Sequence, residues 1–108
     1  MTQVEIRQQG DTMTACIAGE IDHHWAAQLR AQIDERARAA APARLVLDFS
    51  AVTFMDSSGV GLILGRHRLV RTWGGSVAVQ HAPPGIRRML AIAGIEAQET
   101  DEEGGDRT

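Results

Sequence analysis

The hydrophobic period changes along this chain, and that change limits the folds open to it more than any other feature. Residues 3–9 and 12–18 alternate apolar and polar positions, which is the pattern of half-buried strands, and Gly10-Asp11 between them is a turn signal. After Asp22, apolar residues recur at the helical period as far as Pro42. The first part of the chain therefore predicts a β-hairpin followed by an amphipathic helix with Asp22 as its N-cap.

The next segments continue the alternation. The run "RLVLDF", residues 44–49, is almost continuously apolar, as in a central strand buried on both faces. A helix should run from about Ser57 to about Thr72, with residues 76–80 ("SVAVQ") as the next strand. Pro83 and Pro84 then introduce a third helix that ends at Gly94. The inner side of the second helix is predicted to hold Val60, Ile63, Leu64 and Val70.

This order of elements predicts a fold class. A strand–helix–strand alternation implies parallel crossovers, so we expect a small α/β domain with a mixed sheet and crossover helices packed against it. The 108 residues suffice for one domain. The last dozen residues, "AQETDEEGGDRT", are polar and acidic. We therefore expect a domain over residues 1–97 and a disordered acidic tail over 98–108.

Composition narrows the functional classes. The N-terminus "MTQVEIRQQG" has no signal-peptide pattern, and no apolar run is long enough to span a bilayer, so we expect a cytoplasmic protein without a membrane partner. The net charge of −3 and the lack of a dense basic patch argue against a nucleic-acid partner. The single cysteine, Cys16, is predicted to be a small buried hydrophobe in a reducing compartment.

The stretch "FMDSSGVG", residues 54–61, concentrates polar groups where a strand gives way to a helix. This places Asp56, Ser57 and Ser58 at a helix N-terminus, where free backbone N–H groups favour negative charge. One interpretation is that Asp56 or Ser57 only caps the helix. The other is that a serine is phosphorylated there, because the added charge is tolerated by the helix and disrupts an apolar contact with a partner.

Three other kinds of chemistry fit the stretch poorly. A Walker-type phosphate loop needs a lysine after its glycines, and all 11 basic residues of this chain are arginines. A serine-hydrolase elbow needs G-x-S-x-G, whereas Met55 stands two positions before Ser57. A receiver-type phospho-aspartate at Asp48 would need an acidic pair and a lysine that the sequence lacks. The stretch therefore suits a binding switch better than an active site, with hydrolysis left only as a weak alternative.

Two neighbouring motifs remain open between a structural and a functional role. In "GEIDHHW", residues 19–25, Asp22 can cap a helix while His23 and His24 face solvent or a partner; adjacent histidines diverge on a helix, which disfavours a metal site. In "GVGLILG", residues 59–65, three glycines fall within two helical turns. Glycine disfavours a helix interior, so these positions predict close approach, either by the sheet or by a docking partner.

Taken together, these motifs resemble a known family. The segments "GEIDHH", "LVLDFSAVTFMDSSGVGLILGRHRLV" and "GGSVAVQHAPPGIRRMLAIAGI" are similar to the anti-sigma factor antagonists of the STAS domain family, particularly the antagonist of the stage II sporulation sigma switch. The resemblance runs from about Val4 to Ile95. Members of this kind usually continue into another strand and helix, which the acidic tail replaces here.

The resemblance implies a partner switch without catalysis, metal or cofactor. The unphosphorylated antagonist would bind an anti-sigma factor serine kinase and free the sigma factor. The kinase would phosphorylate Ser57, and a serine phosphatase would reverse the modification. The surface that contacts the partner is expected to involve Asp22, His23, Asp56, Ser58, Gly59, Val60 and Gly61. The alternative is a STAS-type scaffold subunit in a larger stress-signalling complex.

Overall fold

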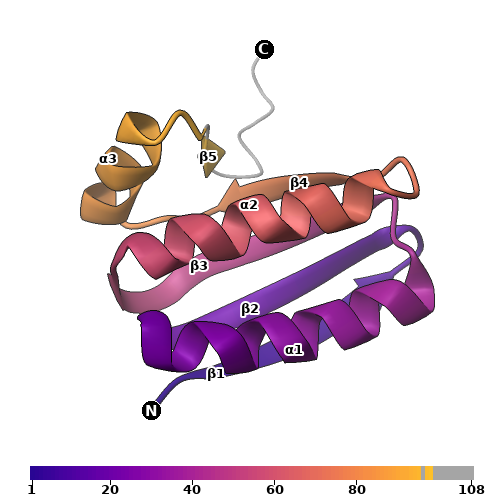
Figure 1. The fold of residues 1–108 in the computed structure, drawn as a ribbon, viewed down its shortest axis with the longest axis horizontal. Coiled ribbons are helices and arrows are strands. Elements are labelled where there is room, and N and C mark those ends of the chain that lie inside the picture. Colours follow the sequence, from indigo (N-terminus) through magenta and orange to yellow (C-terminus); the bar gives the residue numbers. More distant parts are fainter. Residues whose placement is uncertain (96, 99–108) are drawn as a thin grey trace.

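A computed structural model describes residues 1–95, 97 and 98 of the chain. Its elements are strands β1 (Gln3–Gln9) and β2 (Thr12–Ile21), helix α1 (His23–Ala40), strand β3 (Arg44–Met55), helix α2 (Ser57–Arg71), strand β4 (Ser76–Gln80), helix α3 (Pro84–Ile92) and strand β5 (Ala97–Gln98). The predicted order is confirmed, with β5 added at its end (Figure 1).

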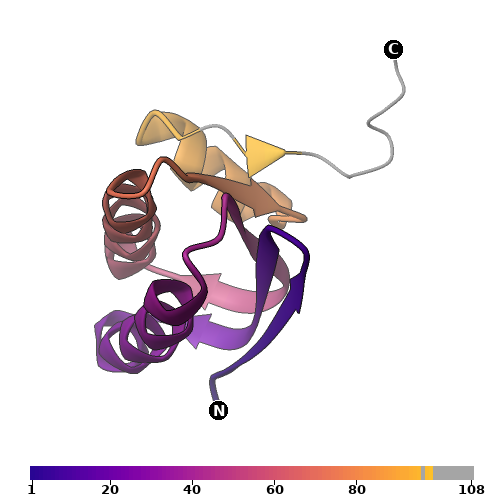
Figure 2. The same cartoon turned by 90° about the vertical axis from the view of Figure 1, so that its right-hand side faces the viewer.

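The strands form one mixed sheet in the order β1-β2-β3-β4-β5. The β1–β2 hairpin is antiparallel, and the pairs β2–β3, β3–β4 and β4–β5 are parallel. Helices α1 and α2 lie side by side on the same face of the sheet, as the end-on view in Figure 2 shows. The small α/β domain with a mixed sheet predicted from the sequence is therefore confirmed.

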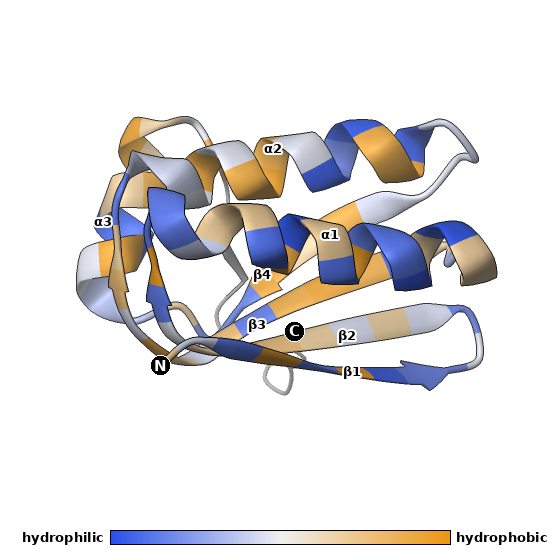
Figure 3. Ribbon diagram, turned by 60° about the horizontal axis from the view of Figure 1, so that its bottom comes forward, coloured by the Kyte–Doolittle hydropathy of each residue, from blue (hydrophilic) through white to orange (hydrophobic). Residues whose placement is uncertain are grey.

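The core lies between the sheet and these two helices. Alternate strand residues point into it, among them Met13, Ile17, Leu45, Leu47 and Phe49, all essentially inaccessible to solvent. Figure 3 shows the resulting division: β3 and β4 are largely hydrophobic, whereas α1 carries long hydrophilic stretches on its outer side. Within the described residues, no helix combines the length and the apolar character needed to cross a membrane.

Two strands are longer than the sequence predicted. β2 continues through Gly19 and Glu20 to Ile21, and β3 continues past Phe49 to Met55. The added residues pair with each other, from Gly19 opposite Val52 to Ile21 opposite Met55, with one register shift between Gly19 and Glu20 and another just before this stretch, between Cys16 and Ala18. The exposed residues of β3 beyond Phe49 hide the strand from a periodicity argument, because only the partner strand fixes their conformation.

The prediction for the C-terminal segment was partly wrong. Residues 97 and 98 form β5, in which Ala97 and Gln98 pair with Val79 and Gln80. Pairing with β4 thus gives order to a stretch whose composition predicted none, and a short strand does follow the third helix. The rest of the predicted tail, residues 99–108, lies outside the described residues.

Candidate functional site

The site is built from two helix N-termini at one edge of the sheet. Ile21 ends β2, Met55 ends β3, and the two residues are partners in the parallel ladder. Each is followed by an aspartate, and the backbone N–H of Asp56 donates a hydrogen bond to the carbonyl of Ile21 at 3.1 Å. Parallel strands end at the same edge of a sheet, so α1 and α2 begin next to each other (Figure 1).

Both aspartates are N-caps. One carboxylate oxygen of Asp22 accepts hydrogen bonds from the backbone N–H groups of His24 and Trp25, each at 3.0 Å. Asp56 accepts one from the N–H of Ser58 at 2.8 Å. The predicted cap at Asp22 is confirmed, and the cap of α2 is Asp56 rather than Ser57. Free N–H groups at both helix starts are thus partly satisfied by side chains.

The two serines differ in exposure. Ser57 is the first residue of α2 and is exposed, and its hydroxyl makes no hydrogen bond to any described residue. Ser58 is half-buried, with its backbone N–H directed to Asp56. Successive residues of a helix point about 100° apart, so a reagent that reaches one hydroxyl does not meet the other in the same way. Ser57 is therefore the more accessible of the two serines.

The surface beside Ser57 continues along the exposed side of α2. Gly61, Leu64 and Arg68 follow Ser57 on this side, with Val60 and Gly65 half-buried at its margin. Leu64 keeps 43% of its surface exposed, and Phe54, just before the helix, keeps 52%. We call this the α2 stripe: Ser57, Val60, Gly61, Leu64, Gly65 and Arg68. It is a narrow apolar surface with a hydroxyl at one end and a guanidinium at the other.

The prediction that Leu64 faces the core was wrong. The buried side of α2 instead holds Gly59, Leu62, Ile63, Arg66 and Val70. The reason lies in Arg66, a charged residue that occupies a core-facing position because it pairs with Asp34 of α1. The apolar pattern alone thus placed Ile63 and Val70 correctly on the buried side but misplaced Leu64 and gave no sign of Arg66.

The glycines divide between packing and surface. A Cβ atom on Gly59 would overlap the side chain of Met55, so this residue is needed for packing against the sheet and is itself buried. Cβ atoms on Gly61 and Gly65 would meet nothing within 4 Å. Of the glycines predicted to shape a docking surface, Gly61 lies on the surface and Gly59 only supports it from below.

The Gly-Glu-Ile-Asp segment is held by the first residues of the chain. Gly19 has a φ of 104°, and a Cβ atom there would overlap the carbonyl oxygen of Met1. The Thr2 hydroxyl donates to the Glu20 carbonyl at 2.7 Å and accepts from the Glu20 N–H at 3.0 Å. Sequence analysis found no role for Gly19, although an isolated glycine in a strand pattern is a signal of close backbone approach.

The histidines at the start of α1 are exposed. His23 opens the helix beside Asp22, and the rings of His24 and Trp25 meet edge to face with centroids 5.0 Å apart. Among the described residues, no three histidine, cysteine or acidic side chains gather closely enough to hold a metal ion. His23 is thus available at the surface, adjacent to the cap that precedes α1.

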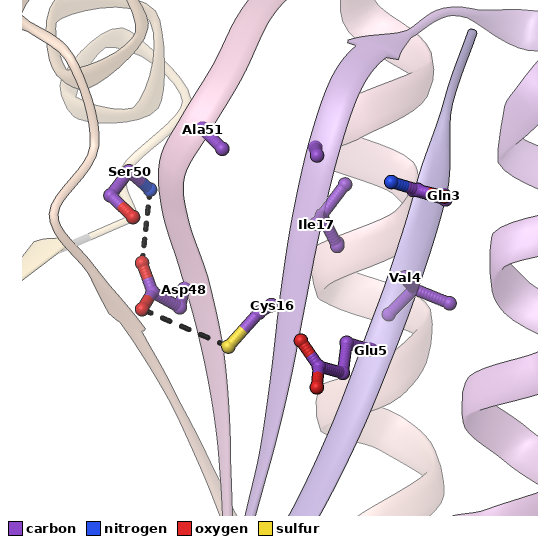
Figure 4. Close-up of a pocket in the computed structure, with 9 residues that line it drawn as sticks. Gln3, Val4, Glu5, Cys16, Ile17, Asp48, Ser50 and Ala51 are labelled. Carbon is purple, nitrogen blue, oxygen red and sulfur yellow. Dashed lines mark hydrogen bonds between the residues drawn. The ribbon is translucent and has the colours of Figure 1, made fainter.

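A second polar cluster lies away from this edge, on the sheet face opposite α1 and α2. Figure 4 shows Cys16, Asp48 and Ser50 of this cluster beside a hollow. The hollow has a volume of about 370 Å³ and is lined by residues of β1, β2 and β3. Asp48 approaches the Cys16 sulfur at 4.0 Å and the His81 Nδ1 atom at 3.3 Å, and accepts a hydrogen bond from the Ser50 N–H at 2.9 Å. Sequence analysis missed this cluster because its members come from distant segments.

The ionisation of this cluster follows from its surroundings. Burial acts to raise the pKa of Asp48, but hydrogen bonds from Ser50 and the His81 imidazole outweigh it, and the pKa ends below its ordinary value. Burial and the Asp48 charge together raise the pKa of Cys16. Cys16 is half-buried rather than buried as predicted, and its thiol stays protonated at neutral pH, which makes it a poor nucleophile.

Residues 3–101 match the STAS domain family, and the chain belongs to this family. Among curated relatives, it is 36% identical over 93 residues to the anti-sigma F factor antagonist of Paenibacillus polymyxa, covering 86% of this chain and 80% of the relative. It is 31% identical over 93 residues to the anti-sigma-B factor antagonist of Bacillus subtilis (strain 168), covering 86% and 84%.

Solved structures give the same answer. The unphosphorylated form of the anti-sigma factor antagonist SpoIIAA superimposes with a TM-score of 0.82 at 30% identity, covering 94% of this chain and 92% of that one. The phosphorylated form of SpoIIAA from Bacillus gives a TM-score of 0.75 at 30% identity, covering 94% and 96%. Within its family the chain is therefore of the anti-sigma factor antagonist type, which confirms the resemblance drawn from the sequence.

Proposed function

We propose that this protein is a phosphorylation-controlled binding module that acts on an anti-sigma factor. In its unphosphorylated form it binds an anti-sigma factor serine kinase in the cytoplasm and releases the sigma factor. The kinase phosphorylates Ser57, and a serine phosphatase removes the phosphate. The protein contributes no catalysis of its own. The single observation that carries this proposal is the exposed Ser57 hydroxyl at the end of the α2 stripe.

Ser57 suits a switch because a phosphate on its hydroxyl would affect the fold and the contact with the partner in different ways. A phosphate at a helix N-terminus interacts favourably with the helix dipole, by about 0.3–1 kcal/mol, so the fold tolerates it. The same group adds roughly −1.5 to −2 charges at the margin of an apolar surface that includes Val60 and Leu64. Burying that charge against a partner is unfavourable, so modification should weaken the complex.

The neighbouring N-cap supports the proposal. Asp22 precedes α1 as Asp56 precedes α2, and the hydrogen bond from Asp56 to Ile21 fixes the two helix starts together. A kinase that approaches Ser57 therefore meets Asp22 and the exposed His23 on the same edge of the sheet. We assign Asp22, His23, Asp56, Ser58, Val60 and Gly61 to the partner-binding region, with Gly59 as its packing support.

Phosphopeptide mass spectrometry after incubation with the cell's own serine kinases and ATP tests the acceptor. We expect phosphate on Ser57, none in the Ser57→Ala variant, and phosphate still located on Ser57 in the matched Ser58→Ala variant. Phosphate confined to Ser58 would contradict the assignment.

Binding assays with the same kinase test the switch itself. Ser57→Ala should keep binding, because a methyl group fits an apolar contact. Ser57→Asp places an unpaired charge in that contact, and a loss of about 3 kcal/mol would lower the affinity roughly a hundredfold. An aspartate variant that binds as tightly as the unmodified protein would refute the proposal. Retention of the chain in a large assembly, without a kinase, would favour the scaffold alternative.

A further inference from the structure

A buried ion pair joins α1 to α2 in the middle of the helix layer. Nε of Arg66 lies 2.8 Å from Oδ1 of Asp34, and the two side chains are only 7% and 12% exposed. Around the pair, both helices present apolar side chains to each other and to the sheet, including Leu29 and Ile33 of α1 and Leu62 and Ile63 of α2. A charged pair in such a layer calls for an explanation.

The Asp34–Arg66 pair is not explained by a contribution to the stability of the fold. The contact has the distance of a hydrogen bond but not its alignment, and Nη1 of Arg66 is buried without a hydrogen-bond partner in the described part of the chain. Burial lowers the pKa of Arg66, the Asp34 carboxylate raises it, and Arg30, Arg38 and Arg68 lower it further. A buried pair with incompletely satisfied atoms is a weak source of stability, but separating its members is costly.

That cost constrains the geometry of the helices. Apolar surfaces remain in contact when one helix rotates or slides slightly on another, whereas a buried ion pair is satisfied at one setting. Buried polar groups fix register in this way in helical assemblies. The other polar contacts of α2 act at its ends: the Asp56 N–H bonds to Ile21 before the helix, and Nε1 of Trp73 donates to the Pro42 carbonyl at 2.9 Å after it.

The setting of α2 determines where its exposed side points. Arg66 belongs to the buried side of the helix, and the α2 stripe lies on the opposite side. Side chains lie about 5 Å from a helix axis, so a rotation of about 20° would move a group on the stripe by roughly 2 Å. Rates of group transfer respond to smaller displacements, since a misplacement of about 1 Å can cost on the order of 100-fold.

We infer that Asp34 and Arg66 are positioning residues that hold α2 at the one setting in which Ser57 and the α2 stripe match the partner. They contact neither the partner nor the transferred phosphate. This inference rests on the proposed function for its biological meaning, but the positioning itself can be tested without any partner.

The test replaces both members of the pair, as Asp34→Leu with Arg66→Met, in the full chain. Apolar replacement of a buried pair is often neutral or stabilising, so we expect a folded protein whose midpoint of urea unfolding is not lowered. The amide signals of residues 57–61 in a ¹⁵N-correlated NMR spectrum should broaden or double, because α2 no longer has a single setting. The Ile33→Val variant perturbs the same helix interface without touching the pair, and should keep single signals.

The second measurement is the rate at which the kinase that modifies the unaltered protein phosphorylates Ser57. We expect a fall of about tenfold or more in the double variant and a change of less than about twofold in Ile33→Val. If the double variant does not fold, Arg66→Met alone replaces it, since Asp34 then keeps Arg30 and Arg38 one helical turn away on α1.

Single, unshifted amide signals for residues 57–61 in the pair-deleted protein would overturn the positioning role, whatever the kinase does. Altered signals together with an unchanged phosphorylation rate would also overturn it, because the setting of α2 would then not matter to the partner. If no kinase modifies the unaltered protein, the proposed function fails, while the NMR comparison still decides whether the pair fixes the helix.

Discussion

Asp22 caps α1 and lies beside Ser57, the proposed phosphate acceptor, and two substitutions separate the structural role from a role in recognition. Asp22→Ala removes the acceptor for two backbone N–H groups, so the free energy of unfolding should fall by about 0.5–2 kcal/mol. Asparagine also caps well, so Asp22→Asn should keep most of that stability. Urea unfolding and Ser57 phosphorylation, measured on both variants, distinguish the roles.

The expected result for Asp22→Asn is a stable protein with slower phosphorylation or weaker partner binding, because the carboxylate has lost its charge while the cap remains. Normal phosphorylation and binding in this variant would reduce Asp22 to a helix cap and nothing more.

Asp48 lies in the cluster on the opposite face of the sheet, and its charge is expected to contribute to stability. Its pKa is below the ordinary value in the folded protein, so its ionised form is favoured by folding. The stability it contributes is fully present above its unfolded pKa of about 3.9 and is lost as the pH falls through the lower folded pKa. Asp48→Asn lacks this dependence.

The unaltered protein should have a higher free energy of unfolding than Asp48→Asn at pH 7. The difference between the two should shrink as the pH is lowered through the range in which carboxyl groups titrate. Urea unfolding at several pH values measures it, and a difference that stays constant down to the acid limit would contradict the assigned pKa direction.

At the scale of elements, helix α2 has one glycine that packs against the sheet, Gly59, and one on its surface, Gly61. Alanine substitutions at the two positions form a matched pair of variants. Gly61→Ala adds a methyl group in open space on a helix, so it should stabilise the fold by about 0.8–1 kcal/mol. Gly59→Ala gains the same helix propensity but forces the added atom against the Met55 side chain, and because overpacking typically costs about 1–3 kcal/mol, we expect a net loss of stability. Thermal or urea unfolding gives both values.

At Gly61, stability and partner binding should change in opposite directions. Gly61→Ala is expected to weaken the complex despite the more stable fold, since the extra methyl group keeps the partner from approaching the α2 stripe. If Gly61→Ala bound as tightly as the unaltered protein, close approach over this helix would not be part of recognition.

The helices and strands also show which structural features local sequence patterns predict and which they do not. Alternating residues in β1 and β2 and the period of α1 were sufficient to predict these segments, because burial repeats at the period of each backbone. In α2 the same period predicted Ile63 and Val70 on the buried side but misplaced Leu64, and it could not predict Arg66 there. Arg66 takes a core position only because Asp34, far away in the sequence, supplies its counter-charge.

The same limit applies to strand ends. The last residues of β3 and the two residues of β5 are strands because another strand lies beside them, not because their own pattern requires it. Pairing of this kind is a tertiary effect, which local propensity does not report.

At the scale of the whole molecule, topology accounts for the part of the site that was predictable. Two strand–helix units in a parallel sheet begin their helices at the same edge, and since consecutive strands usually pair, the order of elements favoured the neighbouring positions of Asp22 and Asp56 with Ser57 that the β2–β3 pairing produces. The Cys16–Asp48–His81 cluster required the three-dimensional register of three strands, and the positioning pair required the packing of two helices. Neither leaves a pattern in the sequence.

Two truncated chains test where the folded domain ends. Residues 99–108 contain acids and small polar residues with almost nothing to bury, so a chain that stops after Gln98 should unfold within about 0.5 kcal/mol of the full protein. A chain that stops after Ile95 also loses the pairing of Ala97 and Gln98 with β4, and should lose on the order of 1 kcal/mol more, because backbone hydrogen bonds each contribute about that much.

Urea unfolding of the three chains, with kinase binding measured in parallel, decides where the domain ends. Equal stability of the two truncated chains would show that β5 contributes nothing to the fold, whereas a large loss on removing residues 99–108 would show that the acidic segment has a structural role. We expect binding to survive both truncations, because Ser57 and the α2 stripe lie on the exposed side of α2, whereas Ala97 and Gln98 pair with Val79 and Gln80 of β4 at the margin of the sheet.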